Sequence, residues 1–268
     1  MDKQSIMNIA NEYVMKSEHN FLSLENAISE ELAGIKIFEE PIFAFGSADD
    51  ELFKLLKNPS AIGENFMLPK EWLLSAKTVI CYFLPFSDEI TEKNKHDKMW
   101  PSDGWLHGRI EGQFFVNNLS IHICNKLKEE GYEAVVPVLD KRFGSARPFT
   151  SNWSERHAAF ICGLGTFGLS KGLITEKGMA GRFGSIVTSM ALEHDERKYH
   201  DIYEYCTMCG ACAGRCPVNA ISVECGKDHR KCSDFLDITK EKYKPRYGCG
   251  KCQVAVPCSR KIPPRKGK

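Results

Sequence analysis

The sequence predicts a mixed α/β domain over residues 1–200, followed by a small cysteine-rich module over residues 201–268. Two observations lead to this division. Apolar runs of strand length alternate with helical stripes through the first part of the chain, which is typical of an α/β layer. Nine of the twelve cysteines follow residue 201, in a segment too short to build a large apolar core of its own.

The first elements follow from local patterns. A helix is expected near the N-terminus, because apolar side chains recur there with helical spacing. One face of this helix carries Ile6, Ile9, Tyr13 and Val14. Residues 77–84 form a continuous apolar run of strand length, which Pro85 ends.

The middle of the chain continues the alternation of helices and strands. A helical stripe ends at Gly131, a residue type that commonly ends helices. The stripe consists of Val116, Leu119, Ile123 and Leu127. Residues 133–139 and 186–192 are apolar enough to be expected as strands.

Residues 152–162 are expected to form a helix, with Asn152 and Glu155 matching an Asn-x-x-Glu cap and Gly163 ending it. Gly163 also opens a G-x-G-x-x-G pattern, which in dinucleotide-binding proteins follows a strand and not a helix. The pattern therefore favours a loop that lets the backbone approach a bulky cofactor, with a plain turn as the alternative. The candidate cofactor-binding residues are Gly163, Gly165, Thr166 and Gly168.

The strongest signal is the run Cys-x₂-Cys-x₂-Cys-x₃-Cys-Pro, formed by Cys206, Cys209, Cys212, Cys216 and Pro217. This is the bacterial ferredoxin pattern for a [4Fe-4S] cluster. The first three thiolates wrap one cubane, whereas the fourth, redirected by the proline, ligates a different cluster. The spacing therefore predicts two clusters. The alternatives are a zinc site, which usually pairs two C-x₂-C units, or a disulfide framework of the secreted type.

The other ligands must come from scattered cysteines, because no second ferredoxin run follows. A crossed arrangement predicts one cluster on Cys206, Cys209, Cys212 and Cys258. It predicts the other cluster on Cys216, Cys232, Cys249 and Cys252. Cys225 is left over as a free or packed thiol, and it is the alternative to Cys232. Apolar neighbours place three further cysteines in the core, namely Cys81, Cys124 and Cys162.

Composition indicates an ordinary globular protein, with 43% hydrophobic and 26% charged residues. No apolar run reaches about 18 residues, and the N-terminus lacks the apolar core of a signal peptide, so a cytoplasmic protein without membrane contact is expected. Residues 226–268 hold thirteen Lys and Arg against four Asp and Glu, although the whole chain carries only +1. This basic segment either contacts an acidic partner or nucleic acid, or compensates the negative charge of the clusters.

The segment from Glu155 to Gly168 resembles the E-R-x₆-G-L-G-x-x-G segment of the epoxyqueuosine reductase family. Residues 184–192 are similar to the strand that follows in that family, and the ferredoxin run, Cys232 and residues 247–253 resemble its cluster module. The resemblance covers about residues 105–260. It implies a nitroreductase-like cobalamin-binding domain fused to a ferredoxin-like module with two [4Fe-4S] clusters, a plan that reductive dehalogenases share.

The chain departs from that family in three places. Phe149 stands where the family has its general-acid aspartate, and a phenylalanine cannot donate a proton. Cys258 is displaced by two residues from the family's last cysteine. The chain also ends at Lys268, without the helical-repeat tail that helps longer members to bind transfer RNA. These departures predict the same redox core with another substrate, and they argue against transfer RNA as a partner.

The expected function is an iron-sulfur oxidoreductase that passes electrons through two [4Fe-4S] clusters to a bound corrinoid (cobalamin), for reduction of a small-molecule or nucleoside-like substrate. A ferredoxin or flavodoxin would donate the electrons. The alternatives are an electron carrier or activator for a partner protein, a flavin-binding reductase, and epoxyqueuosine reductase itself.

The catalytic residues are left open by the sequence. The candidate cobalt ligands or acids among the histidines are His107 and His157, and the candidate carboxylates to replace the missing acid are Asp103, Glu111 and Asp140. The candidate arginines for binding a phosphate or an anionic substrate are Arg142 and Arg147, in a loop whose alternative interpretation is a solvated surface.

Overall fold

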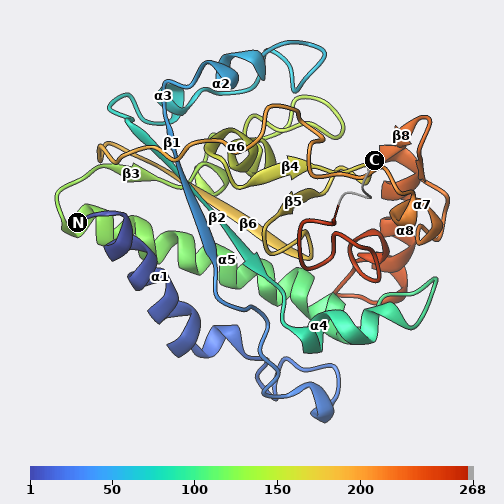
Figure 1. Cartoon of the computed structure of the whole chain (residues 1–268). Coiled ribbons are helices and arrows are strands. Elements are labelled where there is room, and N and C mark those ends of the chain that lie inside the picture. Colours follow the sequence, from blue (N-terminus) through green and yellow to red (C-terminus); the bar gives the residue numbers. More distant parts are fainter. Residues whose placement is uncertain (265–268) are drawn as a thin grey trace.

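A central antiparallel sheet organises the first two thirds of the chain. The computed structural model describes residues 1–264, and within them a four-stranded sheet has the order β1-β2-β6-β3 (Figure 1). Two short hairpins, β4-β5 and β7-β8, lie outside it. The strands are β1 (Ile42–Ser47), β2 (Thr78–Pro85), β3 (Ala134–Val135), β4 (Gly165–Phe167), β5 (Leu173–Thr175), β6 (Gly181–Thr188), β7 (Ile221–Ser222) and β8 (Gly226–Lys227).

Helices cover both faces of this sheet, so the mixed α/β prediction is confirmed. The α-helices are α1 (Lys3–Lys16), α2 (Glu51–Leu55), α3 (Pro69–Trp72), α4 (Asp88–Glu92), α5 (Asp103–Glu129), α6 (Glu155–Cys162), α7 (Ala211–Gly214) and α8 (His229–Lys242). Short 3₁₀ helices are η1 (Glu18–Asn20), η2 (Glu30–Leu32), η3 (Lys93–Lys95), η4 (Pro137–Leu139) and η5 (Lys251–Gln253). Among the described residues, no helix combines the length and the apolar composition that a bilayer crossing needs.

Strand β2 shows how the two layers of core form. All eight of its residues are buried, as the apolar run predicted. Because side chains alternate across a strand, Ile80, Tyr82 and Leu84 join the core beneath α1 and α5, whereas Val79, Cys81 and Phe83 join the core on the side of α6. The sheet is thus buried on both faces.

Two predicted strand boundaries were wrong, each for a local reason. The strand expected over residues 133–139 stops at Val135, and Pro137, which has no N–H to give a sheet, begins η4. The strand expected over 186–192 is β6, which starts at Gly181. Glycines obscure its first half, although Gly184 is required because a Cβ there would lie 2.3 Å from the Tyr82 hydroxyl.

The cap predicted for the third helix was also wrong. Helix α6 begins at Glu155 with Ser154 as its N-cap residue, and Asn152 does not cap it. The Asn152 side chain instead accepts a hydrogen bond from Gly144 N (2.9 Å) and donates one to Arg142 O (2.7 Å). Asn152 therefore closes the preceding loop. Gly163 does end α6, with a left-handed φ of 107°.

The cysteine-rich module lies against one end of the sheet, beside α4 and the beginning of α5 (Figure 1). Backbone contacts hold it there, since Met179 N and Ala180 N donate to Ser259 O, both at 3.1 Å. The Arg260 guanidinium donates to Phe86 O at 2.7 Å. These contacts bring β2 and the segment just before β6 next to the cysteine loops.

Candidate metal centre and adjoining groove

Four cysteines line a small cavity next to the β4-β5 hairpin. They are Cys206, Cys209, Cys212 and Cys258, around about 20 Å³ of free space. Cys206 and Cys209 come from the loop that leads into α7, Cys212 lies in α7 itself, and Cys258 comes from the far end of the module. This is the set that the spacing predicted for one cluster. Cys209 is exposed, so this cavity lies near the surface.

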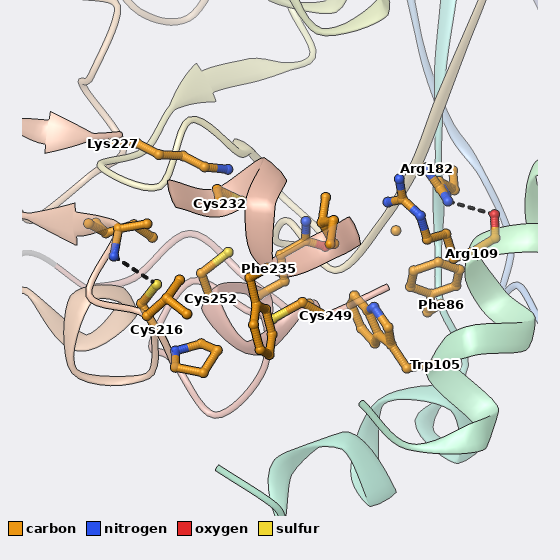
Figure 2. Close-up of a pocket in the computed structure, with 18 residues that line it drawn as sticks. Phe86, Trp105, Arg109, Arg182, Cys216, Lys227, Cys232, Phe235, Cys249 and Cys252 are labelled. Carbon is orange, nitrogen blue, oxygen red and sulfur yellow. Dashed lines mark hydrogen bonds between the residues drawn. The ribbon is translucent and has the colours of Figure 1, made fainter. Parts of the chain in front are cut away.

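A second set of four cysteines lines a larger cavity of about 140 Å³ (Figure 2). The set is Cys216, Cys232, Cys249 and Cys252. Cys232 lies in the first turn of α8, and the Asp228 side chain caps this helix by accepting a hydrogen bond from Lys231 N. Cys225 is exposed and borders neither cavity, which favours Cys232 as the candidate ligand.

The chemistry of both donor sets fits an iron-sulfur cubane. All twelve cysteines are free thiols, and among the described residues no three His, Cys, Asp or Glu side chains are placed to hold a single metal ion. Thiolates on a cubane bind separate irons, so they stand farther apart than the ligands of one zinc ion. Burial raises the pKa of Cys212 to about 11 and that of Cys249 and Cys258 to about 12. Iron must therefore displace protons from these thiols when it binds.

Buried cations surround the second cysteine set. The Lys251 side chain, between Cys249 and Cys252, is 0% exposed. Its Nζ donates to two neutral acceptors, Asn94 O at 2.9 Å and Asn94 Oδ1 at 3.0 Å. Arg215 donates to Lys95 O at 3.0 Å, and its Nε is buried without a hydrogen-bond partner. Positive charge buried in this way suits a cluster with net negative charge.

The predicted core cysteines are buried, as expected. Cys81 on β2 and Cys162 at the end of α6 share the core between the sheet and α6, and Cys124 lies on the buried face of α5. Cys162 Sγ contacts Val79 O at 3.5 Å, and Cys124 Sγ contacts Ala134 O at 3.3 Å.

The glycine motif has a packing role in the structure. A Cβ at Gly165 would lie 2.0 Å from Ile174 O, so glycine is required for the β4-β5 hairpin to close. Thr166 is fully buried, and its hydroxyl accepts a hydrogen bond from Tyr205 N at 2.8 Å. Gly168 borders the first cysteine cavity, next to Cys206. Gly165, Thr166 and Gly168 thus belong to the hairpin segment beside that cavity, whereas Gly163 ends α6, and a contact of these four residues with a cofactor stays a prediction.

An open groove of about 450 Å³ lies on the other side of the α8 N-terminus, where the loop before α6 meets α8. Phe149 forms part of its wall with a left-handed φ of 63°, which is strained for a bulky residue. The Phe149 ring is 57% exposed and stacks on His229, with ring centroids 5.8 Å apart. His229 begins α8, and Cys232 follows one turn later, so this helix borders both the groove and the second cavity.

The groove also carries basic and hydroxyl side chains. Arg156 donates to Lys171 O at 2.5 Å, and Lys171 Nζ donates to the Tyr203 hydroxyl. Burial and the nearby Arg156 and Lys171 lower the pKa of His157 to about 4, so this ring is neutral near pH 7. Its Nδ1 lies 2.8 Å from Ser154 Oγ. The lining suits a polar, partly aromatic ligand.

Two of the other candidates have structural partners. His107 is 0% exposed: its Nε2 accepts a hydrogen bond from Ile28 N at 3.1 Å, and its Nδ1 lies 3.2 Å from Glu111 Oε2. Burial opposes ionisation of Glu111, but hydrogen bonds from His107 and Arg246 lower its pKa overall. Neither side chain faces the groove, so neither replaces the missing acid there.

The remaining candidates also lie outside the groove. Asp140 pairs with Arg142 at 2.8 Å, and hydrogen bonds from Arg142 lower the pKa of Asp140 to about 2. Arg142 donates to Trp72 O at 2.8 Å, and Arg147 donates to Ile62 O at 2.7 Å. Both guanidinium groups therefore hold the loop in place through hydrogen bonds within the chain. Asp103 is exposed in the first turn of α5.

Several residues at the site escaped the sequence analysis. Lys171 and His229 line the groove, and Arg109 and Arg182 line the second cavity. Their positions depend on contacts between distant segments. A usable signal existed only for His229, which follows a capping residue in the helix that carries Cys232.

Comparison with known proteins agrees with the cysteine geometry. Residues 199–222 match the 4Fe-4S binding domain family. Epoxyqueuosine reductase from Vibrio cholerae serotype O1 is 32% identical over 131 residues, which cover 44% of this chain and 34% of that enzyme. The chain thus matches about a third of the length of this relative.

Solved structures share the fold. A reductive dehalogenase described as B12-dependent has a TM-score of 0.56 at 17% identity, covering 83% of this chain and 30% of that one. Epoxyqueuosine reductase from Streptococcus thermophilus has a TM-score of 0.51 at 19% identity, covering 98% of this chain and 68% of that one. The chain thus carries a match to the 4Fe-4S binding domain family, is similar over 131 residues to an epoxyqueuosine reductase, and shares the fold of epoxyqueuosine reductases and reductive dehalogenases.

Proposed function

We propose that this chain is an oxidoreductase in which residues 201–268 hold two [4Fe-4S] clusters and residues 1–200 form a nitroreductase-like domain that holds a corrinoid. One observation carries the proposal: eight cysteines divide into two sets of four, each around its own cavity. The similarity to reductases supports the activity, and the B12-dependent neighbour supports the corrinoid.

Electrons would enter at the first cluster. Its ligand Cys209 is exposed, and Met208 beside it is 40% exposed, so a ferredoxin or flavodoxin can approach this edge. The second cluster lies deeper, between buried Lys251 and the first turn of α8. The crossed ligation joins the two clusters through neighbouring residues of one chain, because Cys212 and Cys216 are four residues apart and serve different clusters.

The corrinoid would lie in the groove next to α8. A corrinoid supplies a cobalt centre that accepts electrons and reacts with an electrophilic substrate. The chain would bind it with the side chains of Ser151, Ser154 and Arg156 and with the ring of Phe149. Phe149 cannot donate a proton, so the reaction differs from one that needs an acid at this position.

The test is anaerobic reconstitution with iron and sulfide, followed by titration with cob(II)alamin. About eight irons per chain and a shifted cob(II)alamin EPR signal are expected. Eight irons without any change in the cobalamin signal would overturn the corrinoid part of the proposal. Tight binding of a flavin in its place would assign the groove to the flavin-binding alternative.

The exposed edge at Cys209 also favours a second function, that of an electron carrier or activator for a partner protein. A carrier needs the clusters but not the groove. Blocking the groove, for example with Ala61→Trp, should abolish substrate reduction if the chain is an enzyme. The same change should leave electron delivery unchanged if the chain is a carrier.

Epoxyqueuosine reduction remains an alternative activity. An epoxyqueuosine reductase that shares this fold was solved with a tRNA stem loop. The expectation that transfer RNA is an unsuitable partner therefore has no support from the comparisons. Incubating the reconstituted chain with an epoxyqueuosine-modified stem loop and a strong reductant tests this activity directly.

A further inference from the structure

The second cysteine cavity has a basic end that the cysteines do not occupy. Figure 2 shows Cys216, Cys232 and Cys252 at one side, and Arg109 and Arg182 at the opposite side, with Cys249 between them. The cavity measures about 140 Å³, and its arginine end lies on the side of Cys249 away from the other three cysteines.

The two arginines are held in place by contacts that leave their charge unpaired. Arg182 donates to Arg109 O at 2.7 Å, which ties the start of β6 to α5. The Arg109 guanidinium lies over the Tyr247 ring, 4.2 Å from its centroid, and its Nε is buried without a hydrogen-bond partner. Within residues 1–264, the arginines that pair with carboxylates are Arg142, Arg197, Arg246 and Arg260.

Two partly buried guanidinium groups side by side repel each other and lose hydration. Burial, followed by repulsion from Arg109, lowers the pKa of Arg182 to about 10, which still leaves it charged at neutral pH. Such a pair is retained at a cost unless an anion joins it. At the cysteine end, Lys227 lines the cavity, and Lys251 and Arg215 lie next to cysteines of the second set in the sequence. The two arginines are therefore not the only cations near the cluster.

We propose that Arg109 and Arg182 bind the carboxylate or phosphate group of a small organic anion beside Cys249. Guanidinium groups present paired donors that match either anion. Trp105 and Phe86 line the same end and would contact the apolar part of the ligand. The inference rests on the proposed function, because the anion would lie beside the second cluster that the proposed function places in this cavity.

The experiment uses the reconstituted chain and three probes at constant ionic strength: benzoate, its neutral analogue benzamide, and inorganic phosphate. Calorimetry gives the affinities, and EPR of the reduced clusters reports binding near the iron. Benzoate or phosphate should bind at least about ten times more tightly than benzamide. Whichever anion binds more tightly identifies the group as carboxylate or phosphate.

Variants then locate the site. Arg182→Gln and Arg109→Gln should each weaken anion binding about tenfold or more and remove the EPR change. Arg142→Gln, an exposed arginine already paired with Asp140, is the matched control and should bind as the unmodified chain does. If Arg182→Gln does not fold, Arg182→Lys is used instead. This variant keeps the charge but loses the planar, paired donors of the guanidinium group, so it should still weaken anion binding.

Two outcomes would overturn the inference: no anion binding above that of benzamide, or binding that survives both glutamine variants. If the arginines only compensate the cluster, the variants lose iron or shift the cluster potential while no anion binds. Iron content and the cob(II)alamin titration are measured separately, so failure of the proposed function is distinguishable from failure of this anion site.

Discussion

The second cysteine cavity and the groove beside Phe149 share the first turn of α8, yet they are built differently. The cavity has four converging thiols and fully buried Lys251, fixed by hydrogen bonds to Asn94. The groove is open, and its wall is a strained, half-exposed phenylalanine. We infer from this difference that a metal centre tolerates little change in its ligands. A ligand groove can instead exchange one wall residue, and the chemistry that occurs in the groove then changes.

The largest expected effect is the loss of a cluster, which tests whether the second cysteine cavity is a metal centre. Cys216→Ala should reduce the iron content from about eight to about four per chain, because it removes a ligand from the second set only. Cys225→Ala is the matched control, since Cys225 is exposed and borders neither cavity. Unchanged iron in Cys216→Ala, or loss in Cys225→Ala, would refute the crossed ligation.

The scaffold under the groove can be probed through Glu155. Burial raises the pKa of its carboxyl to about 8, well above its value in an unfolded chain. The native state then binds more protons than the unfolded state between about pH 4.5 and pH 8, so the unmodified chain loses stability as the pH rises through this window. Glu155→Gln removes this loss.

The Glu155→Gln variant should therefore gain stability over the unmodified chain progressively, reaching about 2–4 kcal/mol at pH 8, with little difference at pH 4.5. Anaerobic urea unfolding at several pH values measures it. Glu129→Gln, in a surface pair with Lys126, is the control and should show no such trend. A pH-independent difference for Glu155→Gln would contradict the buried, protonated carboxyl.

The next prediction concerns the second cysteine cavity and the buried charge of Lys251. Lys251→Met keeps the buried shape and removes the charge, so the more negative reduced state of the second cluster loses stabilisation. The reduction potential should fall on the order of 60 mV, which corresponds to a tenfold change in a one-electron equilibrium. Potentiometric EPR titration measures it, with exposed Lys240→Met as the control. An equal shift in both variants would deny Lys251 a specific role.

The smallest effect concerns the wall of the groove. Phe149 and His229 stack, and a double-mutant cycle with Phe149→Ala and His229→Ala should give a coupling of about 0.5–1 kcal/mol. Phe149→Gly relieves the left-handed backbone and should offset part of the lost stacking. Additive single effects would show that the ring does not rest on His229 in solution.

The sequence predicted those parts that depend on local pattern. Strand β2 was found because its whole length is apolar. The ferredoxin run was recognised because its spacing is local, whereas the four scattered cysteines were assigned only by the crossed arrangement, and the ligation itself stays a prediction. β3 was overestimated because apolar residues continue past Pro137, and Asn152 was misassigned because its partners, Gly144 and Arg142, lie outside the helix it was expected to cap.

The rest required the folded chain. Arg109 and Arg182 are 73 residues apart in sequence and meet only when α5 packs against β6. In the sequence, Lys251 is an ordinary charged residue within a C-x₂-C pair. Its burial and its hydrogen bonds to Asn94, 157 residues away, exist only in the folded chain. The glycine motif suggested a cofactor loop, because sequence cannot distinguish room for a ligand from room for a neighbouring strand such as β5.

The most direct test of the central claim is the iron content and EPR spectrum of the anaerobically reconstituted, fully reduced chain. Two neighbouring clusters predict about eight irons and a spin-coupled spectrum that becomes a simple one in Cys216→Ala. About four irons with a simple, uncoupled spectrum would contradict the assignment of the eight cysteines to two clusters.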